Sequence, residues 1–389
     1  MNKDLTVGKP ESVLCRFCLP LFGSIIFQQL YNIADSFVAG KFIGDNALAA
    51  VGNSYEITLI FIAFAFGCNI GCSVLAAQLF GAKRYKDLKT AVYTSLISST
   101  VICAVLMAAG MIFCNGLLRL IKTPDAVFAD SKLYLDIYIL GLPFVFLYNV
   151  ATGIFSALGD SKTPFLFLAC SSLSNIGVDI LFVTAFDMGV AGVAYATVAS
   201  EVLSAVLVVN CLMHTPGSVH FYPAKMKIHG HKLGEMVKIG LPAGIQSALF
   251  SVSNVLIQSS INSFGSQVMA GCSAASNLEG FVYIAINSFS QATVTFTSQN
   301  VGAKKYDRIG PICLYCNILV TIAWLVTGII AVLFRNQLLG LYNDDPEVIA
   351  YGCERLITVV ALYFICGNME VFTGSLRGMG KSFSPMIVC

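Results

Sequence analysis

The chain has 389 residues, of which 57% are hydrophobic and only 11% are charged, with a net charge of +2. A soluble domain carries roughly 25% charged residues, so this composition excludes a soluble protein whose whole surface is hydrated. The small net charge comes without a basic stripe or interleaved aromatic and basic residues, so no nucleic-acid partner is expected. The expected surroundings are a lipid bilayer.

Long apolar segments follow one another from residue 13 to the end of the chain. A helix that crosses the hydrocarbon core needs about 20 mostly apolar residues. Ten segments meet this requirement and are predicted to be membrane helices: 13–41, 46–76, 90–116, 133–158, 164–186, 190–213, 236–262, 268–297, 309–334 and 348–375. No small-residue cleavage site follows the first segment, so it is predicted to stay in the protein as a helix.

The loops between the predicted helices differ in their basic residues. With a cytoplasmic N-terminus, 17 of the 23 lysine and arginine residues fall on the cytoplasmic side. Loops rich in lysine and arginine usually remain in the cytoplasm. The sequence therefore predicts a multi-pass protein of the cell (plasma) membrane, an inner-membrane protein, with its N-terminus in the cytoplasm.

Similar sequence elements recur on either side of the polar segment 214–235. Leu19-Pro20 recurs as Leu241-Pro242, and Pro124-Asp125 recurs as Pro346-Glu347. The segment 78–83 recurs at 299–304, and 159–164 recurs at 380–385. Every match has an offset of 221 or 222 residues. Matches that stay in register over this length indicate an internal duplication, as in many transporters.

The duplication predicts an all-α polytopic membrane protein with two pseudo-symmetric six-helix lobes. The N-terminal lobe is expected at 13–213, a cytoplasmic linker at 214–235 and the C-terminal lobe at 236–389. An even number of helices gives both lobes the same orientation, so a cavity is expected between them near the middle of the membrane. Residue 389 corresponds to about residue 168 of the first half. The second lobe is thus expected to lack its last two helices, leaving about ten in the chain.

Acidic residues inside predicted membrane helices are candidates for function, because a charge in the bilayer is costly. At 1.5 Å per residue, Asp35 and Asp179 lie roughly 9 and 10 Å from the outer ends of their helices. Thr197 lies at a similar depth, roughly 10 Å from the outer side. Asn175 is one turn from Asp179 on the same helix face. Glu201 follows Thr197 by one turn, and it either extends a proton path or meets the cytoplasmic interface.

We interpret Asp35, Asn175, Asp179 and Thr197 as a site for a coupling cation. Two carboxylates, an amide and a hydroxyl provide hard oxygen ligands that suit a small cation such as Na⁺. The same residues suit a proton, because two carboxylates in low dielectric do not easily both stay ionised. The alternative is structural: Asp179 caps or pairs within the bundle, and Asn175 and Thr197 hydrogen-bond across helices. No other cofactor is expected.

The expected substrate cavity includes residues from both halves. One helix face is shared with Asp35 by three polar residues: Gln28, Tyr31 and Asn32. Glu279 is the best candidate acid of the second half. An acid in an aromatic-lined cavity attracts lipophilic cations through charge and cation–π contacts. The alternative is that Glu279 lies in a polar seam between helices and pairs only with a neighbour.

Several motifs resemble those of the multidrug and toxic compound extrusion (MATE) family, part of the multidrug/oligosaccharidyl-lipid/polysaccharide exporter superfamily. The run Tyr31-Asn-Ile-Ala-Asp35 resembles the first-helix signature. Gln78-x-x-Gly81-Ala82 and its twin at 299–303 resemble a loop motif of the family. Asn175-x-x-x-Asp179, together with Thr197, is similar to the cation site of its N-terminal lobe. The resemblance implies a twelve-helix, two-lobe exporter that expels organic, often cationic compounds against a Na⁺ or H⁺ gradient.

Two other function classes are weighed against this hypothesis. A flippase for lipid-linked saccharide precursors shares the two-lobe architecture, but it calls for a basic cavity, whereas the deep charges here are acidic. An intramembrane enzyme needs paired catalytic groups, and all four histidines fall within 214–235. We therefore expect a monomeric secondary antiporter of small organic substrates, and not an enzyme.

Overall fold

The computed structural model describes residues 4–121, 123–214, 227–262, 264–340 and 345–388. All regular elements within these ranges are helical. The first half contains α1 (Pro10–Val38), η1 (Ala39–Ile43), α2 (Asp45–Gly81), α3 (Tyr85–Leu120), α4 (Asp125–Ala157), α5 (Lys162–Ile180), η2 (Leu181–Ala185) and α6 (Gly189–His214). The second half contains α7 (Gly230–Asn262), α8 (Ser266–Gly302), η4 (Tyr306–Arg308), α9 (Ile309–Leu333), α10 (Arg335–Gly340), α11 (Pro346–Gly378) and α12 (Phe383–Val388).

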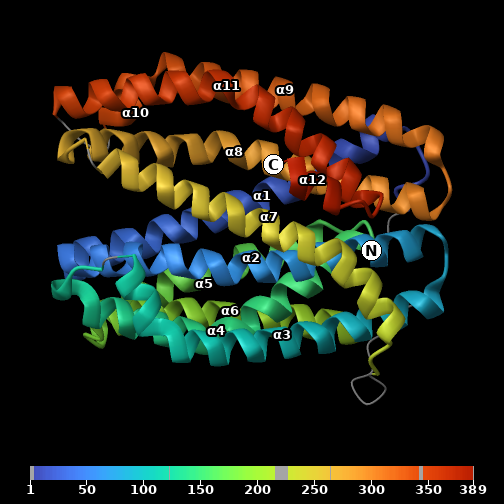
Figure 1. The fold of residues 1–389 in the computed structure, drawn as a ribbon, viewed down its shortest axis with the longest axis horizontal. Coiled ribbons are helices and arrows are strands. Elements are labelled where there is room, and N and C mark those ends of the chain that lie inside the picture. The colour runs from blue at the N-terminus through green and yellow to red at the C-terminus, as the bar shows by residue number, and fades with distance from the viewer. Residues whose placement is uncertain (1–3, 122, 215–226, 263, 341–344, 389) are drawn as a thin grey trace.

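The long helices run roughly side by side, with the first half in blue to green and the second in yellow to red (Figure 1). Among the described residues, eight helices are long and apolar enough to cross a membrane. They are α1 to α6, α9 and α11. α7 and α8 have 33 and 37 residues and carry more serine and asparagine. Each of the ten predicted segments corresponds to a helix, and the chain is a multi-pass membrane protein.

Helix α1 packs against both halves. Its first part contributes Leu14 and Phe17 to a core with α8, α9 and α11 of the second half. The ring of Phe17 meets Phe296 edge-on, with centroids 5.8 Å apart. Its last residue, Val38, packs instead into the core of α2, α3, α4 and α6 in the first half. Helix α1 therefore joins the core of the first half at one end to the core of the second half near the other.

The backbone repeats itself in the two halves. Lys83 and Lys304 both adopt a left-handed conformation, with φ of 57° and 58°. This conformation is uncommon for residues other than glycine. Glycines with positive φ also recur at the same separation, as Gly44 with Gly265 and Gly159 with Gly380. These pairs support the duplication inferred from the sequence, while the exact lobe boundaries remain a prediction.

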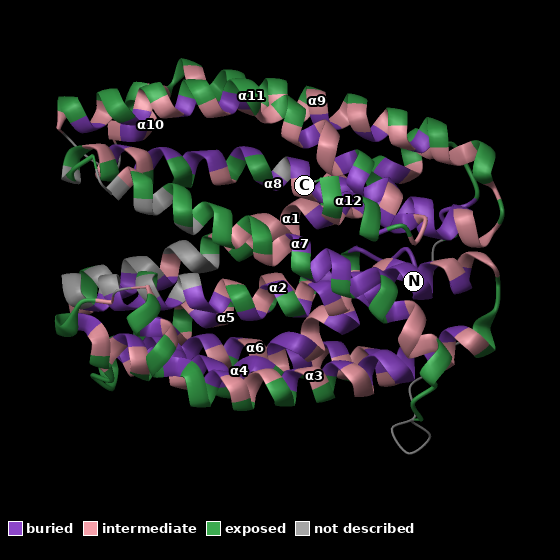
Figure 2. Cartoon of the chain, viewed as in Figure 1, coloured by how far each residue is buried: buried purple, intermediate pink, exposed green. Residues whose placement is uncertain are grey.

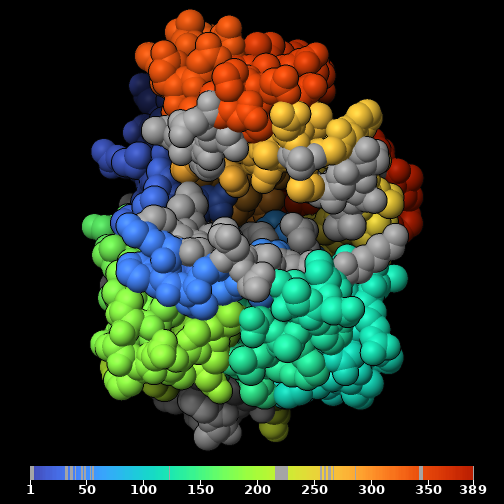
Figure 3. Space-filling model, turned by 90° about the vertical axis from the view of Figure 1, so that its left-hand side faces the viewer, coloured from blue at the N-terminus to red at the C-terminus, as the bar shows by residue number. Residues whose placement is uncertain are grey.

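The two halves meet tightly at one end of the molecule, where α2 and α8 end. A Cβ atom added to Gly81 would lie 2.0 Å from the Gln299 carbonyl oxygen. A Cβ atom on Gly302 would lie 1.9 Å from the Gln78 carbonyl oxygen. Figure 2 shows mostly buried residues at this closed end. At the opposite end, the surface is hollowed between the two halves (Figure 3).

Candidate cation site

The two acidic candidates of the first half lie at helix ends of the same kind. Asp35 is close to the end of α1, and the π-helical turn η1 follows directly. Asp179 is close to the end of α5, and the π-helical turn η2 follows directly. Such π turns are rare and occur frequently at functional sites. η1 and η2 also contact each other, which brings the two helix ends together.

The structure places all four predicted site residues in one cluster. The Thr197 hydroxyl on α6 donates a hydrogen bond to Asp35 Oδ2 at 3.2 Å. The Asp35 carboxylate also lies within interaction range of Asn175 and Asp179 on α5. The cluster is closed off, because Asp35 is 4% exposed and the other three are 0% exposed. Residues from α1, α5 and α6 therefore face one another at a single buried point.

Most oxygen atoms of the cluster lack a hydrogen-bond partner among the described residues. These atoms are Asp35 Oδ1, both carboxylate oxygens of Asp179 and the amide oxygen of Asn175. Burying such groups without a partner is costly, and for an ionised carboxylate it is very costly. A small cation or a proton relieves this cost. The donor set, with two carboxylates, one amide and one hydroxyl, fits Na⁺ as well as H⁺.

Thr197 accommodates both protonation states of Asp35. Its single hydroxyl proton lies between two acceptors, with Val193 O at 2.9 Å and Asp35 Oδ2 at 3.2 Å. When Asp35 is ionised, Thr197 can donate to the carboxylate. When Asp35 carries a proton, it can donate to Thr197, which then donates to the carbonyl group of Val193. Neither state leaves the hydroxyl without a partner.

Two further groups border the cluster. The Tyr134 phenol on α4 interacts with Thr197 and lies in electrostatic range of both aspartates. Sequence reasoning missed Tyr134, because a tyrosine in an apolar helix usually serves packing. The available signal was that a buried phenol needs a polar partner. Glu201 also interacts with Asp35, and its Oε2 atom is buried against Gly141 of α4. The carboxyl group of Glu201 therefore lies inside the bundle.

Comparison with known proteins identifies the family. The profile of the MatE family matches residues 20–181 and 242–389, once in each half. The chain belongs to the MATE family of transporters. It is 28% identical over 382 residues to the "Probable multidrug resistance protein YoeA" of Bacillus subtilis, covering 96% of this chain and 82% of the relative. It is 20% identical over 375 residues to the "Multidrug export protein MepA" of Staphylococcus aureus, covering 96% and 83%.

A solved structure shows the same fold. It is described as an outward-facing conformation of a multidrug resistance MATE family transporter of the MOP superfamily. The TM-score is 0.93 at 21% sequence identity, and the match covers 99% of this chain and 86% of the other. The fold of this MATE chain is therefore that of known family members, including its first-half bundle around the cluster.

The residues predicted to line the substrate cavity do not share one environment in the structure. Gln28 on α1 is exposed. Tyr31 and Asn32 lie outside the described side chains. Glu279 is buried and forms a bidentate ion pair with Arg355 of α11. Arg355 Nε donates to Glu279 Oε1 at 3.0 Å, and Arg355 Nη2 donates to Glu279 Oε2 at 3.2 Å. The charge of Glu279 is thus compensated within the second half, which is the local pairing considered as the alternative. The geometry does not present it as an uncompensated acid that attracts cations.

Replacement of Arg355 by methionine is expected to destabilise the protein. The Glu279 side chain is 6% exposed and would lose its partner. The loss of a charged hydrogen-bonded partner typically costs about 1.5–3 kcal/mol, and the partial exposure of Arg355 favours the lower part of this range. Thermal unfolding of the purified protein measures the effect. The double variant Glu279→Gln/Arg355→Gln should be more stable than Arg355→Met. Equal stability of Arg355→Met and the unchanged protein would contradict the pairing.

Proposed function

We propose that this MATE chain is a secondary active multidrug exporter that exchanges organic, often cationic compounds for H⁺ or Na⁺. The observation that carries the proposal is the buried cluster of Asp35, Asn175, Asp179 and Thr197, whose unpartnered oxygens suit a cation or a proton. The names of YoeA and MepA support drugs as substrates. The cluster supports cation coupling.

We propose further that the N-terminus is cytoplasmic and that the structure is an outward-facing state. Lys83 and Lys304 lie at the closed end, in loops rich in basic residues. Such loops favour the cytoplasmic side. The hollow in Figure 3 then opens to the outside. The likeness to a transporter described as outward-facing supports the same assignment.

In the proposed cycle, a cation enters from the outside and neutralises the Asp35–Asp179 cluster. Its binding favours the inward-facing arrangement, in which the closed end opens and the drug enters from the cytoplasm. The return to the outward-facing state releases the drug. Exchange requires only that the cation and the drug favour different arrangements of the two halves. Helix α1 connects the two events, since it carries Asp35 at one end and packs against the second half near the other.

Transport by the purified protein in lipid vesicles tests this proposal. A lipophilic cationic dye is followed while either a pH gradient or a Na⁺ gradient is imposed, with the membrane potential held at zero. Dye movement opposite to one of the two cation gradients is expected, and the effective gradient identifies the coupling ion. Dye movement that is unaffected by both gradients would contradict the proposal, while movement of a lipid-linked saccharide under the same conditions would favour a flippase.

A further inference from the structure

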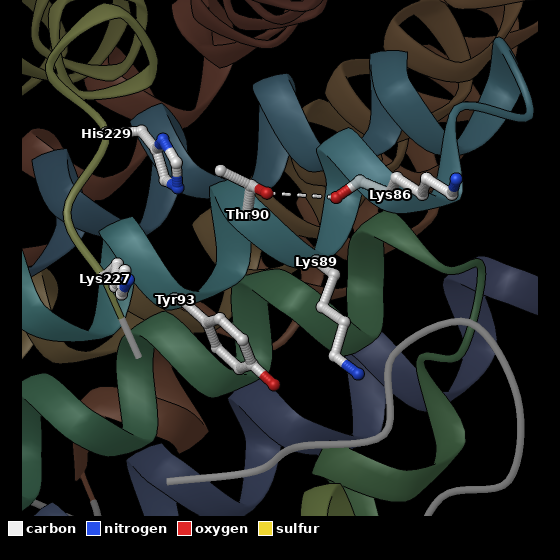
Figure 4. Close-up of a pocket in the computed structure, with 6 residues that line it drawn as sticks. All are labelled: Lys86, Lys89, Thr90, Tyr93, Lys227 and His229. Atoms are coloured by element: carbon white, nitrogen blue, oxygen red, sulfur yellow. Dashed lines mark hydrogen bonds between the residues drawn. The ribbon is translucent and has the colours of Figure 1, made fainter. Parts of the chain in front are cut away.

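A second candidate site lies at the closed end, away from the cation cluster. It is a cavity of about 310 Å³ lined by Lys86, Lys89, Thr90, Tyr93, Lys227 and His229 (Figure 4). The first four residues belong to α3, whereas the last two precede α7. This headgroup pocket, as we name it, is therefore bounded by α3 of the first half and by the segment that leads into α7. Nothing in the proposed export cycle uses it.

The α3 wall of the pocket follows from helical spacing. Lys86, Lys89, Thr90 and Tyr93 lie at i, i+3, i+4 and i+7, so they share one face of the helix. Lys89 Nζ lies 6.0 Å from the centre of the Tyr93 ring. The second wall is held in place by the backbone amide of His229, which donates to the Thr94 hydroxyl at 3.2 Å. This hydrogen bond joins the two walls of the pocket.

The charge of the pocket is positive. Three lysines and one histidine line it, and no acidic residue does. The acids nearest along the chain are engaged by other basic residues: Asp87 pairs with Arg84 at 2.6 Å, and Glu235 pairs with Lys232 at 2.9 Å. The pocket also lies at the N-terminal end of α3, where the helix dipole favours an anion. A ligand with a negatively charged phosphate group fits this chemistry.

The surface of α3 next to the pocket is apolar, which narrows the class of ligand. The face of α3 continues from Tyr93 through Ile97, Val101, Val105, Ala108 and Ile112, at steps of three or four residues. Val101 is 54% exposed and Ile112 is 73% exposed. In a membrane helix, such a stripe faces lipid chains. A basic pocket beside an apolar stripe fits a phospholipid, which has an anionic headgroup and apolar acyl chains. A free anion would contact only the pocket.

We propose that the headgroup pocket binds the phosphate headgroup of an anionic phospholipid, with the acyl chains along α3. Because its walls come from α3 and from the segment before α7, the bound headgroup links the first half to the segment that leads into the second. It therefore stabilises the closed arrangement of this end. The site is independent of the coupling ion, and its failure would leave the proposed export function untouched.

Native mass spectrometry of the purified protein tests the assignment. The probes are phosphatidylglycerol, phosphatidylcholine, glycerol phosphate and inorganic phosphate. Phosphatidylglycerol is expected to bind most tightly. The pocket variant Lys86→Gln/Lys89→Gln/Lys227→Gln should weaken its binding by about 10- to 100-fold. The matched control Lys9→Gln/Lys162→Gln/Lys381→Gln removes three exposed lysines from the same end, and it should bind as the unchanged protein does.

Several outcomes would overturn the proposal. Equal binding of phosphatidylglycerol and phosphatidylcholine would remove the anionic preference, and an equal loss in the control variant would show only a general surface effect. Displacement of the lipid by millimolar inorganic phosphate would assign the pocket to free phosphate instead. The linking role has its own readout. Phosphatidylglycerol should slow amide hydrogen exchange in residues 227–235 of the unchanged protein but not of the pocket variant, and unchanged exchange would disprove the link.

Discussion

Asp179→Asn is expected to reduce gradient-driven efflux strongly while the protein still folds and inserts. The substitution keeps the size of the side chain and removes its charge. Asp179 is fully buried, and both of its carboxylate oxygens lack a partner among the described residues. An amide cannot take up a proton here, and it binds a cation less strongly than a carboxylate does. We expect efflux to fall by about 10- to 100-fold, the size of a typical coupling free energy, and Asp35→Asn should behave similarly.

Dye efflux from vesicles under an imposed gradient measures this effect. Asp136→Asn is the matched control, since Asp136 lies on α4 of the same half and pairs with Lys132 on one side of the helix. The control should transport like the unchanged protein. The amount of protein inserted must be equal in all samples. If Asp35→Asn and Asp179→Asn both kept full gradient-driven efflux, the cluster would not be the coupling site.

Gly302→Ala is expected to prevent the two halves from closing at the end where α2 and α8 meet. The added Cβ atom would lie 1.9 Å from the carbonyl oxygen of Gln78. That oxygen belongs to the backbone and cannot rotate away, so α2 and α8 must separate. Overpacking of this kind typically costs about 1–3 kcal/mol. The closed state then loses its advantage over the open state, and efflux should fall strongly. Gly81→Ala should act in the same way from the other half.

The side chains around this contact show why its closure matters. Gln78 Nε2 donates to the carbonyl oxygen of Gly378 at 2.9 Å, across the two halves. Gln299 Nε2 donates to the carbonyl oxygen of Ala157 at 2.7 Å in the reverse direction. Leu5 N donates to Gln299 Oε1 at 2.9 Å. A separation of α2 and α8 disturbs the Gln78 and Gln299 side-chain bonds that cross between the halves.

Amide hydrogen exchange of residues 295–303 reports on the closed end. Exchange should become faster in Gly302→Ala. Gly310→Ala is the matched control, because a Cβ atom at Gly310 meets no atom within 4 Å. The control should show normal exchange and normal transport. Normal transport by Gly302→Ala would show that this contact does not act as a gate.

The helices and the cation cluster were accessible to sequence reasoning because their signals are local. An apolar segment must be long enough to cross the bilayer, and this can be counted directly. Asp35 and Asp179 were found because a buried acid is costly and therefore rare in such segments. Their meeting with Thr197 followed from equal depth, once the direction of each helix was known. The fold adds the π turns η1 and η2, for which the sequence has no evident signal.

The contacts between distant helices were not accessible in the same way. Arg355 and Glu279 are 76 residues apart, and only the packing of α8 against α11 decides that they meet. The headgroup pocket depends on Lys227 crossing the face of α3, which no pattern in the polar segment indicates. Tyr134 was missed for the same reason, since the face of α4 that meets Thr197 is set by tertiary packing.

The most direct test of the central claim is whether a substrate gradient alone moves the coupling cation. Vesicles containing the protein are loaded with the dye, diluted into dye-free buffer without any cation gradient, and followed with a pH- or Na⁺-sensitive indicator inside. Because coupling between two ligands is reciprocal, outward dye movement should drive the cation inward, and Asp179→Asn should abolish this cation movement. Dye movement without any accompanying flux of H⁺ or Na⁺ in the unchanged protein would contradict cation-coupled export.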